Sequence, residues 1–247
     1  MAPLRALVTG AGTRVGQAIA LALGARGARV AVHYHTSRGG ADATVAKLRE
    51  LGGDGVALQA DLSVRNSARQ LVEQSLAQLG GLDLLVPSAA NFERVPLRDV
   101  DDAAWDRALH LNLRAPFVLA QHAAAALTAS AGSVTFITCS SATVPFRNYL
   151  PYTVSKAALR HLMRTLSLEL APAVRVNAVA PGTVLPPPNM TTETSALLAS
   201  RIPLGRLGEA DDIARAVLFL LDSPFITGHE VVVDGGRSVA GFERFAE

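Results

Sequence analysis

The stretch Leu7-Val8-Thr9-Gly10-Ala11-Gly12-Thr13-Arg14-Val15-Gly16 decides how the rest of the chain is interpreted. It completes a short apolar run, residues 4–8, and leads into a segment rich in Ala and Leu. This order predicts a strand, a tight turn and a helix. Glycines in such a turn let backbone N–H groups and the positive end of a helix dipole approach a phosphate closely. The stretch therefore predicts a phosphate-binding turn.

The composition is that of a globular chain. Of its 247 residues, 49% are hydrophobic and 18% charged, and no Pro/Gly/Ser-rich linker divides them. The single cysteine, Cys139, excludes an internal disulfide and a multi-cysteine metal site, and we expect no metal. The net charge is +2, but the basic residues are scattered, so nucleic-acid binding is not expected.

The beginning of the chain carries no pattern of an export signal, and no apolar run approaches the ~20 residues of a membrane span. We therefore expect a cytoplasmic protein without a membrane partner.

Apolar runs alternate with amphipathic segments along the whole chain. After the first run, six more are typical of strands: 29–34, 55–60, 82–86, 134–138, 174–179 and 230–233. Helical periodicity separates them, which favours parallel strands joined by right-handed crossovers. The sequence thus predicts an α/β fold: one Rossmann-type domain over residues 1–247, with a doubly wound parallel sheet of seven strands flanked by helices. Ligands of such a sheet bind at the carboxyl ends of its strands.

The segment His33-Tyr34-His35-Thr36-Ser37-Arg38 ends the second predicted strand without a carboxylate. An acidic side chain at this point would hold the adenosine ribose of NAD. Cationic or hydroxyl donors that suit a 2′-phosphate stand there instead, and we count among them Arg14, His35, Thr36, Ser37 and Arg38. The segment favours NADPH over NADH; the alternative is an ordinary solvated loop.

Tyr152 and Lys156 are the clearest chemical signal. At i and i+4 the phenol and the ammonium share a helix face, about 6 Å apart at Cβ. A cation so placed favours the phenolate and is expected to lower a phenol pKa from its ordinary ~10. We predict that Tyr152 donates a proton and that Lys156 tunes it. The same spacing also arises by chance on surface helices.

Asn112 precedes Pro116 by four residues within a helical pattern. Because proline lacks the N–H that would bond to the carbonyl of residue 112, we expect a local distortion of the helix there. An alternative role for Asn112 is that of a helix cap at the proline-induced break.

These motifs together resemble the short-chain dehydrogenase/reductase family. Thr9, Gly10 and Gly16 match its opening T-G-x-x-x-G-x-G, with Arg14 in place of the middle glycine. The Tyr-x-x-x-Lys of residues 152–156 is followed, from 174 to 182, by V-R-V-N-x-x-x-P-G, residue for residue. After the fourth strand, Pro87-Ser88-Ala89-Ala90 replaces N-N-A-G, and only Ala89 matches. The resemblance covers essentially the whole chain.

The resemblance implies a site for NADPH and a proton relay. Catalytic roles fall on Tyr152, Lys156 and Asn112, the last holding a water. The serine expected thirteen residues before the tyrosine is Cys139 here. Either Cys139 replaces that serine, or a local shift brings Ser140 or Ser141 into the site, or Cys139 is a small buried apolar side chain. The implied cofactor contacts are Gly10, Thr13, Arg14, Val15, Gly16, His35, Thr36, Ser37, Asp61, Leu62, Ser88, Ala89, Ala90, Tyr152, Lys156, Pro181, Gly182 and Val184.

Within the family, Arg14, the run of residues 33–35 and Phe92 resemble the pteridine reductases. This resemblance implies reduction of a pterin C=N by NADPH, with Phe92 stacked on the substrate and Ser140, Ser141 and Leu185 close to it. The alternatives are a 3-oxoacyl-acyl-carrier-protein reductase or another carbonyl reductase, and a catalytically weak cofactor-binding member. The family also implies a homotetramer.

Overall fold

The computed structural model describes residues 2–184 and 190–240, which build one parallel sheet of seven strands. The strand order is β3-β2-β1-β4-β5-β6-β7. The strands are β1 (Arg5–Val8), β2 (Arg29–Tyr34), β3 (Asp54–Gln59), β4 (Leu84–Val86), β5 (Ser133–Ile137), β6 (Arg175–Pro181) and β7 (Glu230–Val233). The predicted fold class is confirmed, and the limits of the strands differ from the predicted ones by two residues at most.

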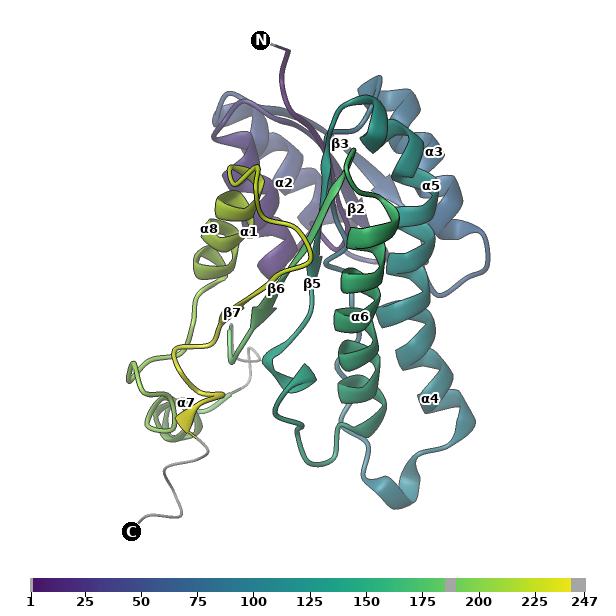
Figure 1. The fold of residues 1–247 in the computed structure, drawn as a ribbon. Coiled ribbons are helices and arrows are strands. Elements are labelled where there is room, and N and C mark those ends of the chain that lie inside the picture. Colours follow the sequence, from purple (N-terminus) through teal and green to yellow (C-terminus); the bar gives the residue numbers. More distant parts are fainter. Residues whose placement is uncertain (1, 185–189, 241–247) are drawn as a thin grey trace.

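Helices cover both faces of the sheet (Figure 1). One face carries α3 (Ser67–Leu79), α5 (Ala115–Ala129) and α6 (Leu150–Glu169). The opposite face carries α1 (Arg14–Gly24), α2 (Arg38–Glu50) and α8 (Ala210–Leu221). Because side chains alternate along a strand, Leu7 packs under the first set of helices and its neighbour Val8 under the second. Apolar residues on both faces are what a strand buried between two helical layers requires.

Five shorter elements complete the described part of the chain. Four of them are α4 (Asp102–Leu109), α7 (Thr192–Ala199) and two 3₁₀ turns, η1 (Leu97–Asp99) and η3 (Ser140–Ala142). Asp101 caps α4, because its carboxylate accepts the Ala104 N–H at 2.7 Å. Between α4 and α5 the chain forms a π-helical turn, η2 (His110–Arg114). This turn is the distortion that Pro116 predicted: the missing N–H interrupts the regular helical ladder.

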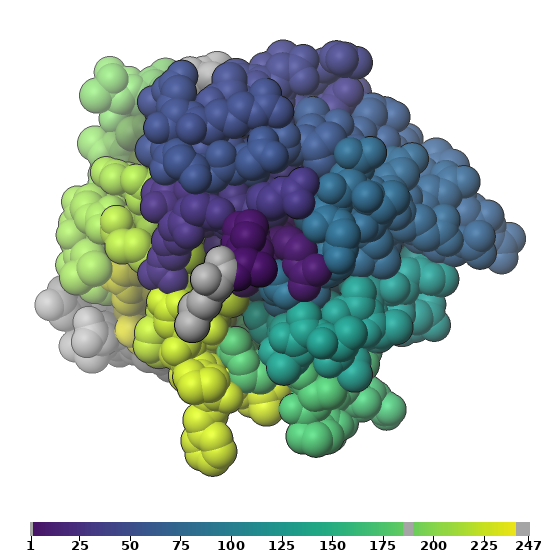
Figure 2. Space-filling view, turned by 90° about the horizontal axis from the view of Figure 1, so that it is seen from above, coloured from purple at the N-terminus to yellow at the C-terminus, as the bar shows by residue number. Residues whose placement is uncertain are grey.

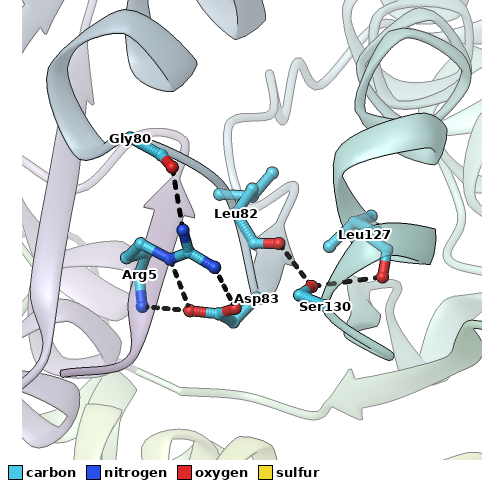
Figure 3. Close-up of polar contacts among 6 residues, drawn as sticks. All are labelled: Arg5, Gly80, Leu82, Asp83, Leu127 and Ser130. Carbon is cyan, nitrogen blue, oxygen red and sulfur yellow. Dashed lines mark hydrogen bonds and ion pairs between the residues drawn. The ribbon is translucent and has the colours of Figure 1, made fainter. Parts of the chain in front are cut away.

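The amino ends of the strands are joined by polar contacts (Figure 3). The Arg5 guanidinium donates to both carboxylate oxygens of Asp83, at 2.9 and 2.7 Å, and to the Gly80 carbonyl at 2.9 Å. Burial alone would raise the pKa of Asp83, but the hydrogen bonds and charge of Arg5 outweigh it and lower that pKa. Ser130 donates to the Leu82 carbonyl at 2.7 Å. These contacts tie β1, the segment before β4 and the end of α5 together.

Figure 2 looks onto this end of the molecule, where the N-terminal segment lies near the centre of the face. The carboxyl ends of the strands lie at the opposite end, toward α7 in Figure 1. No helix in the described ranges is long and apolar enough to cross a membrane.

Candidate active site

A cleft of 440 Å³ opens at the carboxyl ends of the strands, where α1 begins. All the residues for which we expected a cofactor contact line this cleft, except Arg38 and Val184. Val184 lines a neighbouring cavity, because the chain after Gly182 turns away to form a bridge with Gly208. The residues that line this cleft come from many separate elements, which meet at the carboxyl ends of the strands.

The turn after β1 needs its glycines. Gly10 has a φ of +66°, and a Cβ there would stand 3.1 Å from the Ala89 Cα. A Cβ on Gly16 would overlap the carbonyl oxygen of Gly10. Arg14 also has a positive φ, +54°, which a non-glycine residue adopts at a cost of about 1 kcal/mol. Its position is the one where the family pattern has glycine, so Arg14 keeps the backbone shape and adds a cation.

His33 holds this turn from the adjacent strand. Its ring is 2% exposed; Nδ1 accepts the Gly10 N–H at 3.1 Å, and Nε2 lies 3.0 Å from the Ala60 carbonyl. The proton is therefore on Nε2, which donates to Ala60. Burial lowers the pKa of His33 to about 4, so the ring is neutral at pH 7. Sequence reasoning used His33 only as a mark of resemblance; a polar residue inside an apolar strand was the available signal.

Thr9 holds the segment that replaces the family's N-N-A-G. Thr9 is buried, with 1% of its surface exposed. Its Oγ1 accepts the N–H groups of Ser88 at 2.9 Å and Ala89 at 3.0 Å. The side chain of Thr9, directly after β1, thus joins the carboxyl ends of β1 and β4. Residues 88–90 line the cleft without the amide side chains of the family pattern.

At the far end of the cleft, Thr36 and Ser37 stand immediately before α2. Neither α1 nor α2 has an acidic residue in its first turn. Two helix N-termini without carboxylates favour anions at this end. His35 lies 3.5 Å from Asp61, and both line the cleft. Arg38 does not line it and forms an ion pair with Asp42 at 3.4 Å.

Tyr152, Lys156 and Cys139 meet at the inner end of the cleft. All three are buried: 8%, 3% and 7% exposed, respectively. The Lys156 ammonium lies 5.8 Å from the centre of the Tyr152 ring and donates to the Ile137 carbonyl at 2.9 Å. Cys139 lines the cleft beside Tyr152 and raises the pKa of its phenol. Cys139 lines both this cleft and the cavity beside it, whereas Ser140 lines only that cavity.

The pKa values differ from the expectation for this pair. Burial raises the pKa of Tyr152 well above its ordinary value, and the charge and hydrogen bond of Cys139 raise it further. Burial lowers the pKa of Lys156 to about 8, although the charge of Cys139 acts in the opposite direction and raises it. The free-energy cost of removing water from a Tyr152 phenolate exceeds the stabilisation that the Lys156 ammonium would give it, because that ammonium donates to the Ile137 carbonyl instead. In this structure the phenol stays protonated.

Asn112 connects the cleft to α6. Its Oδ1 accepts the Asn91 N–H at 2.9 Å, and its Nδ2 donates to the Asn91 carbonyl at 3.2 Å and to Ser155 Oγ at 3.1 Å. The side chain is fully buried and is used in positioning. Because Pro116 has no N–H, it cannot donate to the backbone carbonyl of Asn112. A water relay at this point would therefore use that carbonyl.

A second cavity, of 730 Å³, adjoins the first. Tyr152, Cys139, Arg14 and Gly182 line both, so the phenol stands where they join. The other lining residues that bear on the site are Phe92, Ser140, Phe146, Arg147, Tyr149, Thr183 and Arg237.

The expected substrate residues distribute as follows. Phe92 lines the second cavity, but it stacks on Tyr149, with ring centres 4.4 Å apart. Ser140 also lines it, whereas Ser141 is buried beneath and donates its N–H to Cys139 Sγ at 3.4 Å. Leu185 lies outside the described residues. Sequence reasoning missed Arg237, which reaches this cavity from beyond β7.

The two cavities suit transfer between a bound cofactor and a second molecule. A phenol and a thiol lie at the junction, with an ammonium beside the phenol in the first cavity, and they offer a proton donor there. The described residues contain no cluster of side chains that could hold a metal ion.

Comparisons with known proteins agree with this geometry. A family model described as enoyl-(acyl carrier protein) reductase matches residues 10–238. An uncharacterised oxidoreductase of Methylorubrum extorquens is 37% identical over 239 residues, covering 94% of this chain and 96% of the relative.

Two solved structures have the same fold. The FolM alternative dihydrofolate reductase 1 of Brucella suis, in complex with NADP, is 34% identical with a TM-score of 0.90, covering 96% of this chain and 95% of that one. A blue fluorescent protein from a metagenomic library, in complex with NADPH, is 34% identical with a TM-score of 0.88, covering 94% and 96%. The family model, the relative and the solved structures all match nearly the whole length of the chain. The chain therefore belongs to the short-chain dehydrogenase/reductase family of oxidoreductases.

Proposed function

We propose that this protein is an NADPH-dependent reductase that delivers a hydride to a C=N or C=O bond, with a dihydropteridine or dihydrofolate-type compound as its substrate. The observation that carries the proposal is that Tyr152 and Cys139 lie at the junction of the two cavities, with Lys156 beside Tyr152 in the first cavity. One cavity accommodates a cofactor and the other a substrate, and the phenol faces both.

The first cavity fits a phosphorylated nicotinamide dinucleotide. The absence of a Cβ on Gly10 and Gly16 leaves the backbone open to a pyrophosphate, next to the N-terminus of α1. Arg14, Thr36 and Ser37 would hold the 2′-phosphate, supported by the N-terminus of α2. When bound, NADPH supplies the hydride. The solved relatives that carry NADP or NADPH support this assignment.

Tyr152 performs the proton step. The phenol is protonated at neutral pH and is positioned to give its proton to the nitrogen or oxygen of a substrate that is being reduced. Burial opposes this step because it raises the pKa of Tyr152, so the phenolate needs a positive charge beside it. Lys156, with a pKa of about 8, is mainly charged at pH 7 and can stabilise the phenolate left behind. Cys139 lines both cavities beside the phenol, so its thiol is placed to contact the substrate there. Asn112 positions the loop after β4 against α6.

Two features support a pterin substrate. The second cavity has an aromatic wall, which suits a flat heterocycle. A similar solved protein is titled an alternative dihydrofolate reductase. Carbonyl reduction is the second candidate, and a relative in Streptomyces violaceoruber that is named a putative ketoacyl reductase, 35% identical over 239 residues, favours it.

The proposal is tested by the loss of NADPH absorbance with dihydrobiopterin, dihydrofolate or an acetoacetyl thioester as substrate. We expect turnover of a dihydropterin. Turnover of the thioester alone would replace the pteridine assignment by the carbonyl one, and turnover of none, with NADPH bound, would indicate the catalytically weak member.

Tyr152→Phe tests the proton step. Removal of the hydroxyl should lower kcat at least about a hundredfold while the Kd for NADPH stays within about twofold. Lys156→Met should also lower kcat, whereas the matched change Lys47→Met, at an exposed residue on α2 that pairs with Glu50, should not. Substantial residual turnover in Tyr152→Phe would exclude this phenol as the acid.

We also propose a homotetramer, as the family resemblance implies. Apolar side chains on the outer surfaces of α5 and α6 support it: Phe117 is 38% and Leu168 80% exposed. Light scattering at micromolar concentration tests the assembly, and a monomer would overturn it.

A further inference from the structure

The second cavity has a chemical direction. Its wall is a continuous series of aromatic contacts: Tyr152 meets Phe92 edge-on with ring centres 4.7 Å apart, and Phe92 stacks on Tyr149 at 4.4 Å. Tyr149 in turn meets Phe146 edge-on at 6.4 Å. The series begins at the proton donor and continues away from the cofactor cleft, since none of the three rings beyond Tyr152 lines that cleft.

The far end of this series is cationic. The Arg237 guanidinium lies over the Phe146 ring, 5.4 Å from its centre, and a hydrogen bond to Thr183 Oγ1 holds it there. Arg147, next to Phe146 in the chain, lines the same cavity and is exposed. Stacking and a hydrogen bond fix the plane of Arg237 and leave other N–H groups for a ligand.

No carboxylate balances these charges in the described ranges. No acidic side chain lines the cavity, and neither Arg147 nor Arg237 forms an ion pair within residues 2–184 and 190–240. The carboxylates that stand near in sequence are used elsewhere. Asp234 accepts the N–H groups of Gly236 at 2.9 Å and Ser238 at 2.7 Å, and Glu93 pairs with Arg107 at 3.0 Å.

We propose that this cavity selects a substrate with a carboxylate at the end remote from its reducible group, and that Arg237, assisted by Arg147, binds that carboxylate. The flat part of the substrate lies along the aromatic wall, and the reducible bond reaches Tyr152. Arg14, the third arginine of the cavity, also lines the cofactor cleft and is assigned to the cofactor phosphates. The inference rests on the proposed reductase function and adds the substrate class to it.

Two guanidinium groups without a carboxylate partner favour an anion for a simple reason. In a cavity with a partly apolar wall, the effective dielectric constant is lower than in water, so two positive charges attract an anion more strongly there than they would in bulk solvent. A planar guanidinium can donate two parallel N–H groups to a carboxylate, which a neutral hydroxyl tail cannot match. Folates carry such carboxylates, whereas biopterin carries a neutral dihydroxypropyl tail.

The experiment compares paired substrates. The pterin pair is dihydrofolate against dihydrobiopterin, and the carbonyl pair is 4-oxocyclohexanecarboxylate against cyclohexanone. For each pair, the ratio of kcat/KM for the anionic over the neutral substrate is measured in the wild type and in Arg237→Gln, Arg147→Gln and Arg237→Lys. The control is Arg26→Gln, which removes the same charge from an exposed pair with Asp222 after α1, at the opposite end of the sheet.

We expect Arg237→Gln to lower the ratio about tenfold or more through KM, because a hydrogen bond to a charged group contributes at least that factor. Arg147→Gln should lower it by a smaller factor, Arg237→Lys should restore part of it, and Arg26→Gln should leave it unchanged. Raising the salt concentration should also reduce the ratio in the wild type. A merely structural Arg237 would lower both substrates of a pair alike and leave the ratio unchanged.

The outcomes separate this inference from the proposed function. A ratio that falls in the carbonyl pair while no pterin is reduced overturns the pteridine assignment and supports the carboxylate site. A ratio that is the same in the wild type and Arg237→Gln overturns the carboxylate site, whichever pair is turned over. If no pair is turned over, calorimetric titration of folate and biopterin into the NADP⁺-loaded enzyme decides: equal affinity for the two overturns the site.

Discussion

Acid should loosen the glycine-rich turn, because a single buried histidine holds it in its neutral form. His33 Nδ1 accepts the Gly10 N–H, and Nε2 donates to the Ala60 carbonyl. A second proton would go to Nδ1, where it would face the Gly10 N–H. Protonation therefore breaks one hydrogen bond and leaves a charge in a ring that is 2% exposed.

The size of this effect follows from the pKa. Burial lowers the pKa of His33 from its ordinary 6.5 to about 4. The contribution of His33 to the free energy of unfolding is complete above pH 6.5 and is lost as the pH falls from 6.5 to about 4. Between these two values the unfolded chain binds a proton at His33 and the folded chain does not. Each pH unit costs about 1.4 kcal/mol, so the free energy of unfolding should fall by about 3 kcal/mol from this residue.

Urea unfolding, followed by tryptophan fluorescence between pH 4 and pH 7.5, measures this loss. His33→Gln keeps a donor for Ala60 but does not titrate, so its stability should be lower at pH 7 and depend less on pH. The matched control is His161→Gln, at an exposed position on α6. Carboxylates titrate in all three proteins, and the difference between wild type and variant isolates His33. Parallel pH profiles for the wild type and His33→Gln would refute the role of His33.

Three further predictions concern the site and the sheet. Cys139→Ser replaces a weak thiol donor by a hydroxyl, so kcat/KM should rise about threefold, and a fall would mean that the thiol itself is required. Gly16→Ala brings a methyl group onto the Gly10 carbonyl, so the Kd for NADPH should rise about tenfold or more by fluorescence titration; an unchanged Kd would contradict the close packing of the turn. Asp83→Asn removes the carboxylate that binds Arg5 at the end remote from the site, so the melting temperature should fall by about 5 °C with an unchanged KM, and a changed KM would contradict that separation.

The amino-acid sequence alone determined the fold class and much of the cleft. A strand buried on both faces must be apolar throughout, so Leu84-Leu85-Val86 and the other strands are visible as short apolar runs. The glycines at 10 and 16 and the pair Tyr152 and Lys156 were equally accessible, because backbone conformation and the i, i+4 relation depend on neighbours in the sequence. The helix distortion at Asn112 was predictable for the same reason, from the missing N–H of Pro116.

Only the tertiary structure decided which groups act on one another across the chain. His33 holds Gly10 through a contact spanning 23 positions, and Arg237 reaches Phe146 and Thr183 from the far end of the sequence. Which of Cys139, Ser140 and Ser141 lines the cleft beside Tyr152 depended on the path of the chain after β5. The pKa of Tyr152 rose where the sequence predicted a fall, because the loss of water around a side chain depends on how all of its neighbours pack, and spacing along one helix does not contain that information.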